Sequence, residues 1–288
     1  MRPDSPLPQA FPPQVSEPSK PGVAVVQFAP GTDPSANLAA IREHTRTARD
    51  QGARVVLAPE YSMFAVSRID HRALAAAQSL TGPFVTGLGE IAREFGGYLV
   101  AGMVERIDAD EDRISNTLVA LDPEGNLCAH YRKVHLYDAF GQRESDVVRP
   151  GEIETPATFT VDNVTFGMQT CFDLRFPEGI RRVAAAGAHV LLLPAQWIPG
   201  QGKVDQWTTL LRARAIENTV YVAAADQCGK RGAGASMIID PAGVVLAELG
   251  DEPGVLVAAV DQDRLAEVRA ANPSLSLRRF AIAEHTPE

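Results

Sequence analysis

Three side chains that could act together in catalysis each stand at the edge of a predicted strand. Glu60 ends an apolar run, Lys133 lies in a strand-like segment, and Cys171 closes another β-rich run shortly before a helix that begins at a proline. A cysteine near a helix N-terminus lies where the helix dipole favours the thiolate, which is the nucleophilic form. A carboxylate can transfer protons, and an ammonium group can stabilise a developing negative charge. These residue types predict a cysteine hydrolase.

The composition limits the class of protein. The chain has 288 residues, of which 45% are hydrophobic, and this is ample for a large buried core. The net charge of −9 argues against nucleic-acid binding, which depends on neutralising phosphates. No apolar run approaches the length of a membrane span, and the N-terminus does not have the pattern of a secretory signal. We therefore expect a cytoplasmic protein with neither nucleic acid nor membrane as its partner.

The three cysteines are best considered one at a time. Cys128, Cys171 and Cys228 are an odd number and form no CxxC pair, so a disulfide framework is not expected. We expect Cys128 and Cys228 to be small buried hydrophobic residues. The six histidines include no HExxH pattern and no paired His/Cys spacing, which argues against a metal site.

Proline content and element spacing suggest three regions. Residues 1–21 hold seven prolines among polar residues, and we expect a disordered tail there. Residues 22–262 have no linker-like composition and are predicted to form one domain. Residues 263–288 are predicted to form a C-terminal helix and tail, which could lie at a subunit interface.

Hydrophobic periodicity predicts alternating helices and strands across that domain. We expect helices at 37–50, 83–95, 179–186, 204–217 and 263–270. Strands are expected at 22–29, 55–58, 98–104, 114–121, 127–132, 158–161, 164–170, 190–193, 220–225, 236–239, 244–249 and 255–260. Several strands are joined by short hairpin turns, so the fold class is α/β with mixed rather than purely parallel sheets. One sheet covered on both faces, or two sheets packed together with helices outside, would both fit.

Six motifs in order resemble the nitrilase superfamily of carbon–nitrogen hydrolases. The motifs are VLAPE at 56–60, YRKVHLYD at 131–138, RES at 143–145 followed by PG at 150–151, CFDLRFPE at 171–178, LLRARAIEN at 210–218 after Trp207, and VYVA at 220–223. The resemblance implies a four-layer α-β-β-α sandwich of two mixed sheets with helices on the outer faces. Within the superfamily, the motifs most resemble the amidases that act on ω-amides of 2-oxo acids and on deaminated glutathione.

The resemblance also implies a catalytic role for each matching residue. Cys171 would attack a carbonyl carbon and form a thioester, and Glu60 would move the protons. Lys133, with the backbone N–H after Cys171, would stabilise the oxyanion. Glu144 matches a second acid that positions the lysine or the substrate. No cofactor is implied, and family members are commonly dimers or larger, so a homo-oligomer is expected.

Four residues near the nucleophile are predicted to bind substrate: Phe172, Arg175, Gln196 and Trp197. Arg175 could bind a substrate carboxylate, or it could pair with Asp173 or Glu178 and brace the turn. The cationic residues Arg175, Arg212 and Arg214 favour a substrate with a carboxylate.

The leading hypothesis is hydrolysis of a small linear, non-peptide amide to a carboxylic acid and ammonia. A nitrilase or an N-carbamoyl amino acid hydrolase would share the same three catalytic residues. A papain-like pair of Cys171 with His135 or His189 is a further alternative. A catalytically silent binding protein on the same scaffold is the alternative outside the enzymes.

Overall fold

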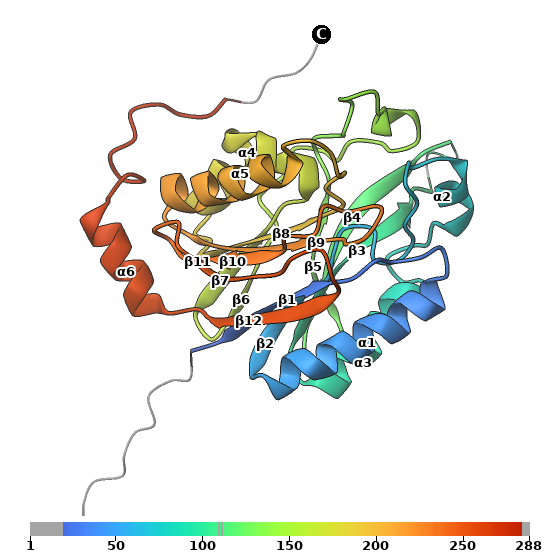
Figure 1. Cartoon of the computed structure of the whole chain (residues 1–288), viewed down its shortest axis with the longest axis horizontal. Coiled ribbons are helices and arrows are strands. Elements are labelled where there is room, and N and C mark those ends of the chain that lie inside the picture. The colour runs from blue at the N-terminus through green and yellow to red at the C-terminus, as the bar shows by residue number, and fades with distance from the viewer. Residues whose placement is uncertain (1–19, 109, 111, 284–288) are drawn as a thin grey trace, which may run out of the picture.

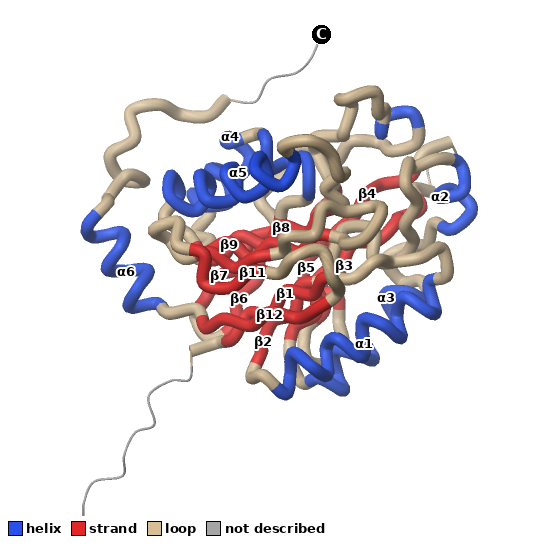
Figure 2. Tube along the Cα trace, viewed as in Figure 1, coloured by secondary structure: helices blue, strands red, loops and turns tan. Residues whose placement is uncertain are grey.

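The computed structural model describes residues 20–108, 110 and 112–283. Two six-stranded sheets lie face to face in the centre, with helices outside them (Figures 1 and 2). Most of the predicted disordered tail, residues 1–19, lies outside the described residues, as do residues 284–288 of the predicted C-terminal tail.

The first sheet has the strand order β12-β1-β2-β3-β4-β5. Its strands are β1 (Gly22–Gln27), β2 (Ala53–Leu57), β3 (Tyr98–Arg106), β4 (Ile114–Leu121), β5 (Leu127–Arg132) and β12 (Gly254–Ala259). β1, β2 and β3 run parallel, and the remaining neighbours pair antiparallel. This sheet is mixed because the chain uses crossover helices in its first part and hairpin turns afterwards.

The second sheet has the order β11-β10-β9-β8-β7-β6. Its strands are β6 (Thr158–Val161), β7 (Val164–Met168), β8 (Val190–Ala195), β9 (Tyr221–Asp226), β10 (Met237–Ile239) and β11 (Val245–Glu248). Again three central strands, β7, β8 and β9, are parallel and the outer pairs are antiparallel. The two sheets are therefore built alike.

Helices cover the outer face of each sheet. α1 (Pro34–Asp50) and α3 (Pro83–Phe95) lie on the first sheet, and α4 (Pro177–Ala185) and α5 (Lys203–Asn218) lie on the second (Figure 1). α1 begins at Pro34 rather than at the expected residue 37, because the Asp33 carboxylate accepts hydrogen bonds from the backbone N–H groups of Ser35 and Ala36. The predicted four-layer α-β-β-α sandwich is confirmed.

The core follows from the alternation of side chains along each strand. In β1, Val23 and Val25 point into the apolar layer between the sheets, whereas Ala24 and Val26 point toward the helices. Both faces of the central strands are therefore buried, and this explains their nearly continuous apolar sequences. The rigid sheets fix the strand ends from which the candidate site residues extend.

Several local predictions are wrong. The helix α2 (His71–Ala76) lacks a clear apolar pattern and was not predicted. Cys128 is exposed rather than buried because it lies on the edge strand β5, whereas Cys228 is buried as predicted. The described cysteines are all free thiols.

The C-terminal part leaves the sandwich. α6 (Gln262–Ala271) lies at one side, and the following segment extends away from it as an arm (Figure 1). Leu277, Phe280 and Ile282 in this arm are exposed. Among the described residues, no helix combines the length and the apolar character that crossing a bilayer requires.

Candidate active site

Glu60 follows the end of the central strand β2 and is buried between the two sheets' strand ends. Its Oε1 accepts hydrogen bonds from Lys133 Nζ at 3.0 Å and Asn116 Nδ2 at 2.7 Å. Its Oε2 accepts one from the backbone N–H of Gln196 at 2.6 Å. Gly102 on the neighbouring strand makes room, because a Cβ there would lie 2.6 Å from the Tyr61 nitrogen. The Glu60 turn can therefore lie directly against β3.

Lys133 comes directly after β5 and points into the same buried space. Its backbone N–H donates to the Asn116 carbonyl at 2.9 Å, which continues the pairing with β4 past the last strand residue. Its ammonium lies 3.0 Å from Glu60 and 2.9 Å from Glu144, and the side chain is only 2% exposed. One buried positive charge is thus shared between two buried carboxylates.

Glu144 begins the short 3-10 helix η1 (Glu144–Asp146). Its Oε1 accepts from Tyr61 Oη at 2.7 Å and from Asn116 Nδ2 at 3.1 Å, and its Oε2 accepts from the backbone N–H of Tyr137 at 2.6 Å. With Lys133 included, every oxygen of this carboxylate has donors. Glu144 therefore fixes the lysine and closes the loop between residues 137 and 144.

Cys171 occupies a tight turn after β7 and, as predicted, stands shortly before a helix that begins at a proline. It is the first residue of the 3-10 helix η2 (Cys171–Arg175), and α4 follows from Pro177. Its φ of 47° is left-handed, which non-glycine residues rarely adopt. The sulfur lies 3.9 Å from the Gln196 carbonyl oxygen, and the residue is 6% exposed.

Asp173 connects the cysteine turn to the lysine segment. Its Oδ2 accepts from the Thr170 N–H at 3.0 Å and from Tyr131 Oη at 2.8 Å. Its Oδ1 accepts from the His135 N–H at 3.1 Å and lies 2.7 Å from His135 Nδ1. Because residues 131 and 135 flank Lys133, this buried carboxylate holds the two parts of the site in register.

A small cavity of about 50 Å³ joins these groups. It is lined by Glu60, Tyr61, Val66, Ser67, Arg68, Ile69, Lys133, Tyr137, Gln142, Arg143, Glu144, Cys171, Gln196 and Ile198. A larger groove of about 750 Å³ lies beside edge strand β5 and α4, but none of the four predicted catalytic residues lines it. The small cavity is the candidate active site because it holds the reactive groups.

The alternative of a cysteine–histidine pair finds no support in this geometry. No histidine is among the described residues that line the cavity. His135 is bound to Asp173 and lines the larger groove, and His189 Nδ1 accepts a hydrogen bond from the Thr165 N–H at 3.0 Å. Nor do the described residues include a cluster of three potential metal ligands.

The electrostatics of the cavity differ from what the helix N-terminus predicts for Cys171. Burial and the neighbouring Glu60 carboxylate hold the pKa of the Cys171 thiol well above its usual value, although the Lys133 charge acts in the opposite direction. The resting sulfur is therefore a neutral thiol. The expectation of a dipole-stabilised thiolate is wrong, because the sulfur is almost fully desolvated and faces a carboxylate.

The lysine and the second acid are both in their charged forms. Burial opposes the charge of Lys133, but Glu144 and Glu60 outweigh it and raise the pKa of Lys133 well above its usual value. Burial likewise opposes the charge of Glu144, but Lys133 and the hydrogen bond from Tyr61 lower the pKa of Glu144. A charged acid–base pair thus stands beside a neutral nucleophile.

The residues predicted to bind substrate are divided between two places. Gln196 lines the cavity, and its Nε2 donates to the Val66 carbonyl at 2.9 Å. Phe172, Arg175 and Trp197 do not line it but gather beside it, with the Arg175 guanidinium 4.8 Å from the Trp197 ring and 6.0 Å from the Phe172 ring. Of the four residues, only Gln196 can therefore contact a molecule inside the small cavity itself.

Arg175 does not brace the turn through an acid. Its Nη2 donates to Gln206 Oε1 at 2.7 Å, and it forms no ion pair with Asp173 or Glu178. The other two arginines predicted to favour a carboxylate substrate, Arg212 and Arg214, instead form hydrogen bonds to backbone carbonyl groups. Arg212 donates to the Gly243 carbonyl and Arg214 to the Leu174 carbonyl.

Sequence patterns missed four residues that complete the site: Asn116, Tyr61, Tyr137 and Lys203. Asn116 bridges Glu60 and Glu144, and the polar residues at the start of the buried strand β4 were the available signal. Tyr61 is adjacent to Glu60 in sequence, but only its φ of 54° turns the hydroxyl toward Glu144. Lys203 Nζ donates to Tyr137 Oη at 3.2 Å, a contact between distant segments that no local pattern reveals.

Comparison with known proteins identifies the family. A family model described as carbon-nitrogen hydrolase matches residues 22–270. A protein named as a hydrolase of Mycobacterium tuberculosis is 37% identical over 263 residues, which cover 86% of this chain and 91% of the relative. A deaminated glutathione amidase of Escherichia coli O157:H7 is 41% identical over 220 residues, covering 75% of this chain and 82% of the relative.

A solved structure agrees with these sequences. An amidase from Nesterenkonia sp. AN1, as a glutamate-to-glutamine mutant, has a TM-score of 0.77 and 29% identity, and the match covers 94% of this chain and 97% of that one. In that structure the active-site cysteine carries the acetamide moiety of fluoroacetamide. The predicted resemblance is confirmed: the chain belongs to the carbon–nitrogen hydrolase family, among the amidases of the nitrilase superfamily.

Proposed function

We propose that Glu60, Lys133 and Cys171 are the catalytic triad of this amidase and that Glu144 positions the lysine. The observation that carries the proposal is the position of the Lys133 ammonium. It lies 3.0 Å from Glu60 and lines the same small cavity as Cys171. The three residues come from three separate strand ends, so the shared cavity is a property of the whole fold.

In the proposed first half-reaction, the Cys171 sulfur attacks the amide carbonyl carbon. Because the resting thiol is neutral, a base must take its proton, and Glu60 is the proposed base because it lines the same cavity and its charge acts on the thiol. Glu60 then passes this proton to the nitrogen as the C–N bond breaks, which leaves an acyl thioester on Cys171.

Negative charge that develops on the carbonyl oxygen needs donors held in place beforehand. The Lys133 ammonium is such a donor, since its two carboxylate partners fix it. The backbone N–H of Phe172 is the second proposed donor. Loss of one donor of this kind typically lowers turnover by about 10²- to 10³-fold. In the second half-reaction, Glu60 activates a water molecule that hydrolyses the thioester.

The proposed substrate is a small linear amide with a carboxylate. The cavity is too small for a folded polypeptide, and Arg68 and Arg143 lie on its lining. Several relatives are named deaminated glutathione amidase, which points to that compound or to an ω-amide of a 2-oxo acid. The product would be the carboxylic acid together with ammonia or an amine.

A substrate panel tests the proposal. Purified protein would be incubated with a 2-oxo acid ω-amide, deaminated glutathione, an aliphatic nitrile and an N-carbamoyl amino acid, and the released ammonia or amine measured. We expect turnover of the first two compounds, its loss in Cys171→Ala, and its retention in the matched control Cys228→Ala. Hydrolysis of only the nitrile or the carbamoyl compound would assign one of those activities instead, and an inert protein would indicate a silent binding scaffold.

Assembly and location remain part of the proposal. We propose a homo-oligomer, because the C-terminal arm exposes the large apolar side chains of Leu277 and Phe280. We also propose a cytoplasmic location, because the described cysteines are all free thiols, as is usual in compartments that keep thiols reduced. Size-exclusion chromatography with light scattering tests the first point, and cell fractionation tests the second.

A further inference from the structure

Two positively charged side chains lie together beside the cavity without an acidic partner. Within the described part of the chain, neither Arg175 nor Lys203 forms an ion pair. Lys203 is nine-tenths buried, and among the described residues its ammonium donates a hydrogen bond only to Tyr137 Oη. The Arg175 Nε is buried and has no hydrogen-bond partner in the part of the chain that the structure describes. Buried charges are normally paired, so this pair of cations calls for an anion.

Aromatic rings hold both cations in place. The Lys203 ammonium is 4.2 Å from the centre of the Phe140 ring and 5.4 Å from that of Trp197. The Arg175 guanidinium lies 5.6 Å and 4.8 Å from the same two rings. Cation–π contacts orient the charges but supply no negative charge. The cluster of Lys203, Arg175, Phe140 and Trp197 is therefore preformed and electrostatically unbalanced.

The unbalanced charge acts on Lys203 itself. Burial, followed by the Arg175 charge, lowers the pKa of Lys203, whereas a charge on Cys171 raises it. Lys203 is also the first residue of the 16-residue helix α5, whose N-terminal end disfavours a cation and favours an anion. An anion bound between the two side chains would stabilise the charged form of Lys203. It would also interact favourably with the N-terminal end of α5.

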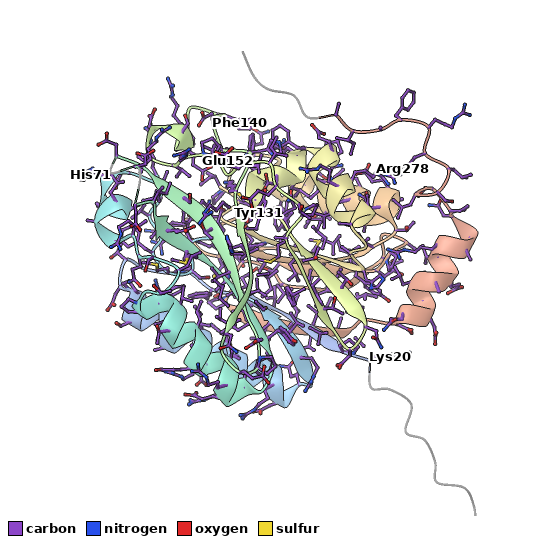
Figure 3. All side chains as sticks on the ribbon, turned by 180° about the vertical axis from the view of Figure 1, so that it is seen from behind. Lys20, His71, Tyr131, Phe140, Glu152 and Arg278 are labelled. Atoms are coloured by element: carbon purple, nitrogen blue, oxygen red, sulfur yellow. The ribbon has the colours of Figure 1, made fainter. Side chains whose placement is uncertain are left out.

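The cluster adjoins the catalytic cavity through Tyr137. This residue lines the cavity, and its hydroxyl accepts the hydrogen bond from Lys203 at 3.2 Å. Phe140, in the same loop, is 68% exposed and lies at the upper edge of the molecule in Figure 3. A molecule with one end at Cys171 and the other beyond Tyr137 would therefore extend from the nucleophile to the two cations.

We propose that Lys203 and Arg175 together bind the remote carboxylate of the substrate, and that Lys203 determines specificity for linear monoamides of dicarboxylic acids. The inference rests on the proposed amidase function and deepens it. The amide end reacts at Cys171, and the carboxylate at the other end forms charge-assisted hydrogen bonds with the ammonium and the guanidinium.

A pair of matched substrates separates this inference from the amidase function. Glutaramate carries the carboxylate, and the corresponding amide with a terminal alcohol lacks it. The quantity of interest is the ratio of kcat/KM for glutaramate to kcat/KM for the alcohol. We expect Lys203→Met to lower this ratio about 10- to 100-fold, mainly through KM, because a charge-assisted hydrogen bond is lost.

Two control variants sharpen the test. Lys203→Arg keeps the positive charge and should hold the ratio near that of the wild type. Lys230→Met makes the same change at an exposed lysine outside the cavity lining and should not alter the ratio. If Lys203→Met does not fold, Phe140→Ala replaces it, and a selective rise in KM for glutaramate is the expected result.

An unchanged ratio in Lys203→Met, or a wild-type preference for the alcohol, would overturn the inference while leaving the amidase function intact. Absence of turnover with both amides would overturn the inference, and absence of turnover across the substrate panel as well would overturn the amidase function with it. Inhibition by glutarate provides an independent readout, since dicarboxylate binding should weaken in Lys203→Met and persist in Lys203→Arg.

Discussion

Lys133 is the residue on which the electrostatics of the cavity depend. Its ammonium contacts both Glu60 and Glu144, and the Asn116 amide bridges the same two carboxylates. Like charges so close and so deeply buried repel each other unless a cation lies between them. The lysine therefore stabilises the resting site as well as the developing oxyanion.

Replacing Lys133 with methionine tests this double role. The change keeps the length of the side chain but leaves two buried carboxylates without their cation. We expect the free energy of unfolding to fall by about 3–5 kcal/mol, together with loss of turnover. Urea denaturation followed by circular dichroism measures the change, with Lys230→Met as the matched control. A loss of stability below about 1 kcal/mol would contradict the proposed ion-pair arrangement.

The Glu144 carboxylate predicts a specific dependence of stability on pH. Its pKa in the folded protein is lowered from 4.5, because Lys133 and Tyr61 outweigh the effect of burial. A group of this kind contributes stability above its unfolded pKa and loses it as the pH falls through the folded value. The stability difference between wild type and Glu144→Gln should therefore be constant above about pH 5 and shrink below pH 4.5. Urea denaturation at a series of pH values measures it, and a difference that grows on acidification would disagree.

At the scale of the elements, strands and turns could be predicted to different degrees. Apolar runs predicted the strands that end near Glu60 and Cys171, since such runs are favoured in buried strands. The turns that aim these side chains depend on left-handed backbone at Tyr61 and Cys171, which no residue type there signals. The sequence therefore does not predict the 3-10 helix between Cys171 and Arg175.

Contacts between elements were the least predictable part of the site. Asp173 appeared in the sequence as one polar residue in a motif, and its bonds to Thr170, Tyr131 and His135 exist only after folding. One of the two alternatives for Arg175 was pairing with an acid nearby in sequence, yet its hydrogen-bond partner is Gln206 on α5. Local spacing cannot reveal partners that a separate helix supplies.

Gly102 allows a test of how closely β3 and the Glu60 turn must approach. An alanine Cβ would lie 2.6 Å from the Tyr61 nitrogen and 2.8 Å from the Glu60 Cα, so the backbone must move. We expect Gly102→Ala to lower kcat about 100-fold, because small displacements of catalytic groups have effects of that size. Gly250→Ala is the matched control, since a Cβ there meets nothing within 4 Å. Steady-state kinetics with a melting curve for each variant would decide, and equal activities would contradict the argument.

At the scale of the whole molecule, the site exists because two similar sheets are packed face to face. Glu60 extends from the first sheet, and Cys171 and Gln196 extend from the second, while Gln196 donates its backbone N–H to Glu60 across the interface. The sequence alone left one sheet or two sheets open, because periodicity describes strands and not their stacking. The family resemblance supplied the sandwich.

The most direct test of the account is whether Cys171 carries the acyl group during turnover. Wild-type protein would be mixed with an amide that it hydrolyses and quenched in acid within milliseconds. The quenched protein would then be examined by intact-protein mass spectrometry and peptide mapping. We predict a mass increase equal to the acyl group on the peptide that contains Cys171, and none in Cys171→Ala. Undiminished turnover by Cys171→Ala, or an acyl group on a different residue, would contradict the central claim.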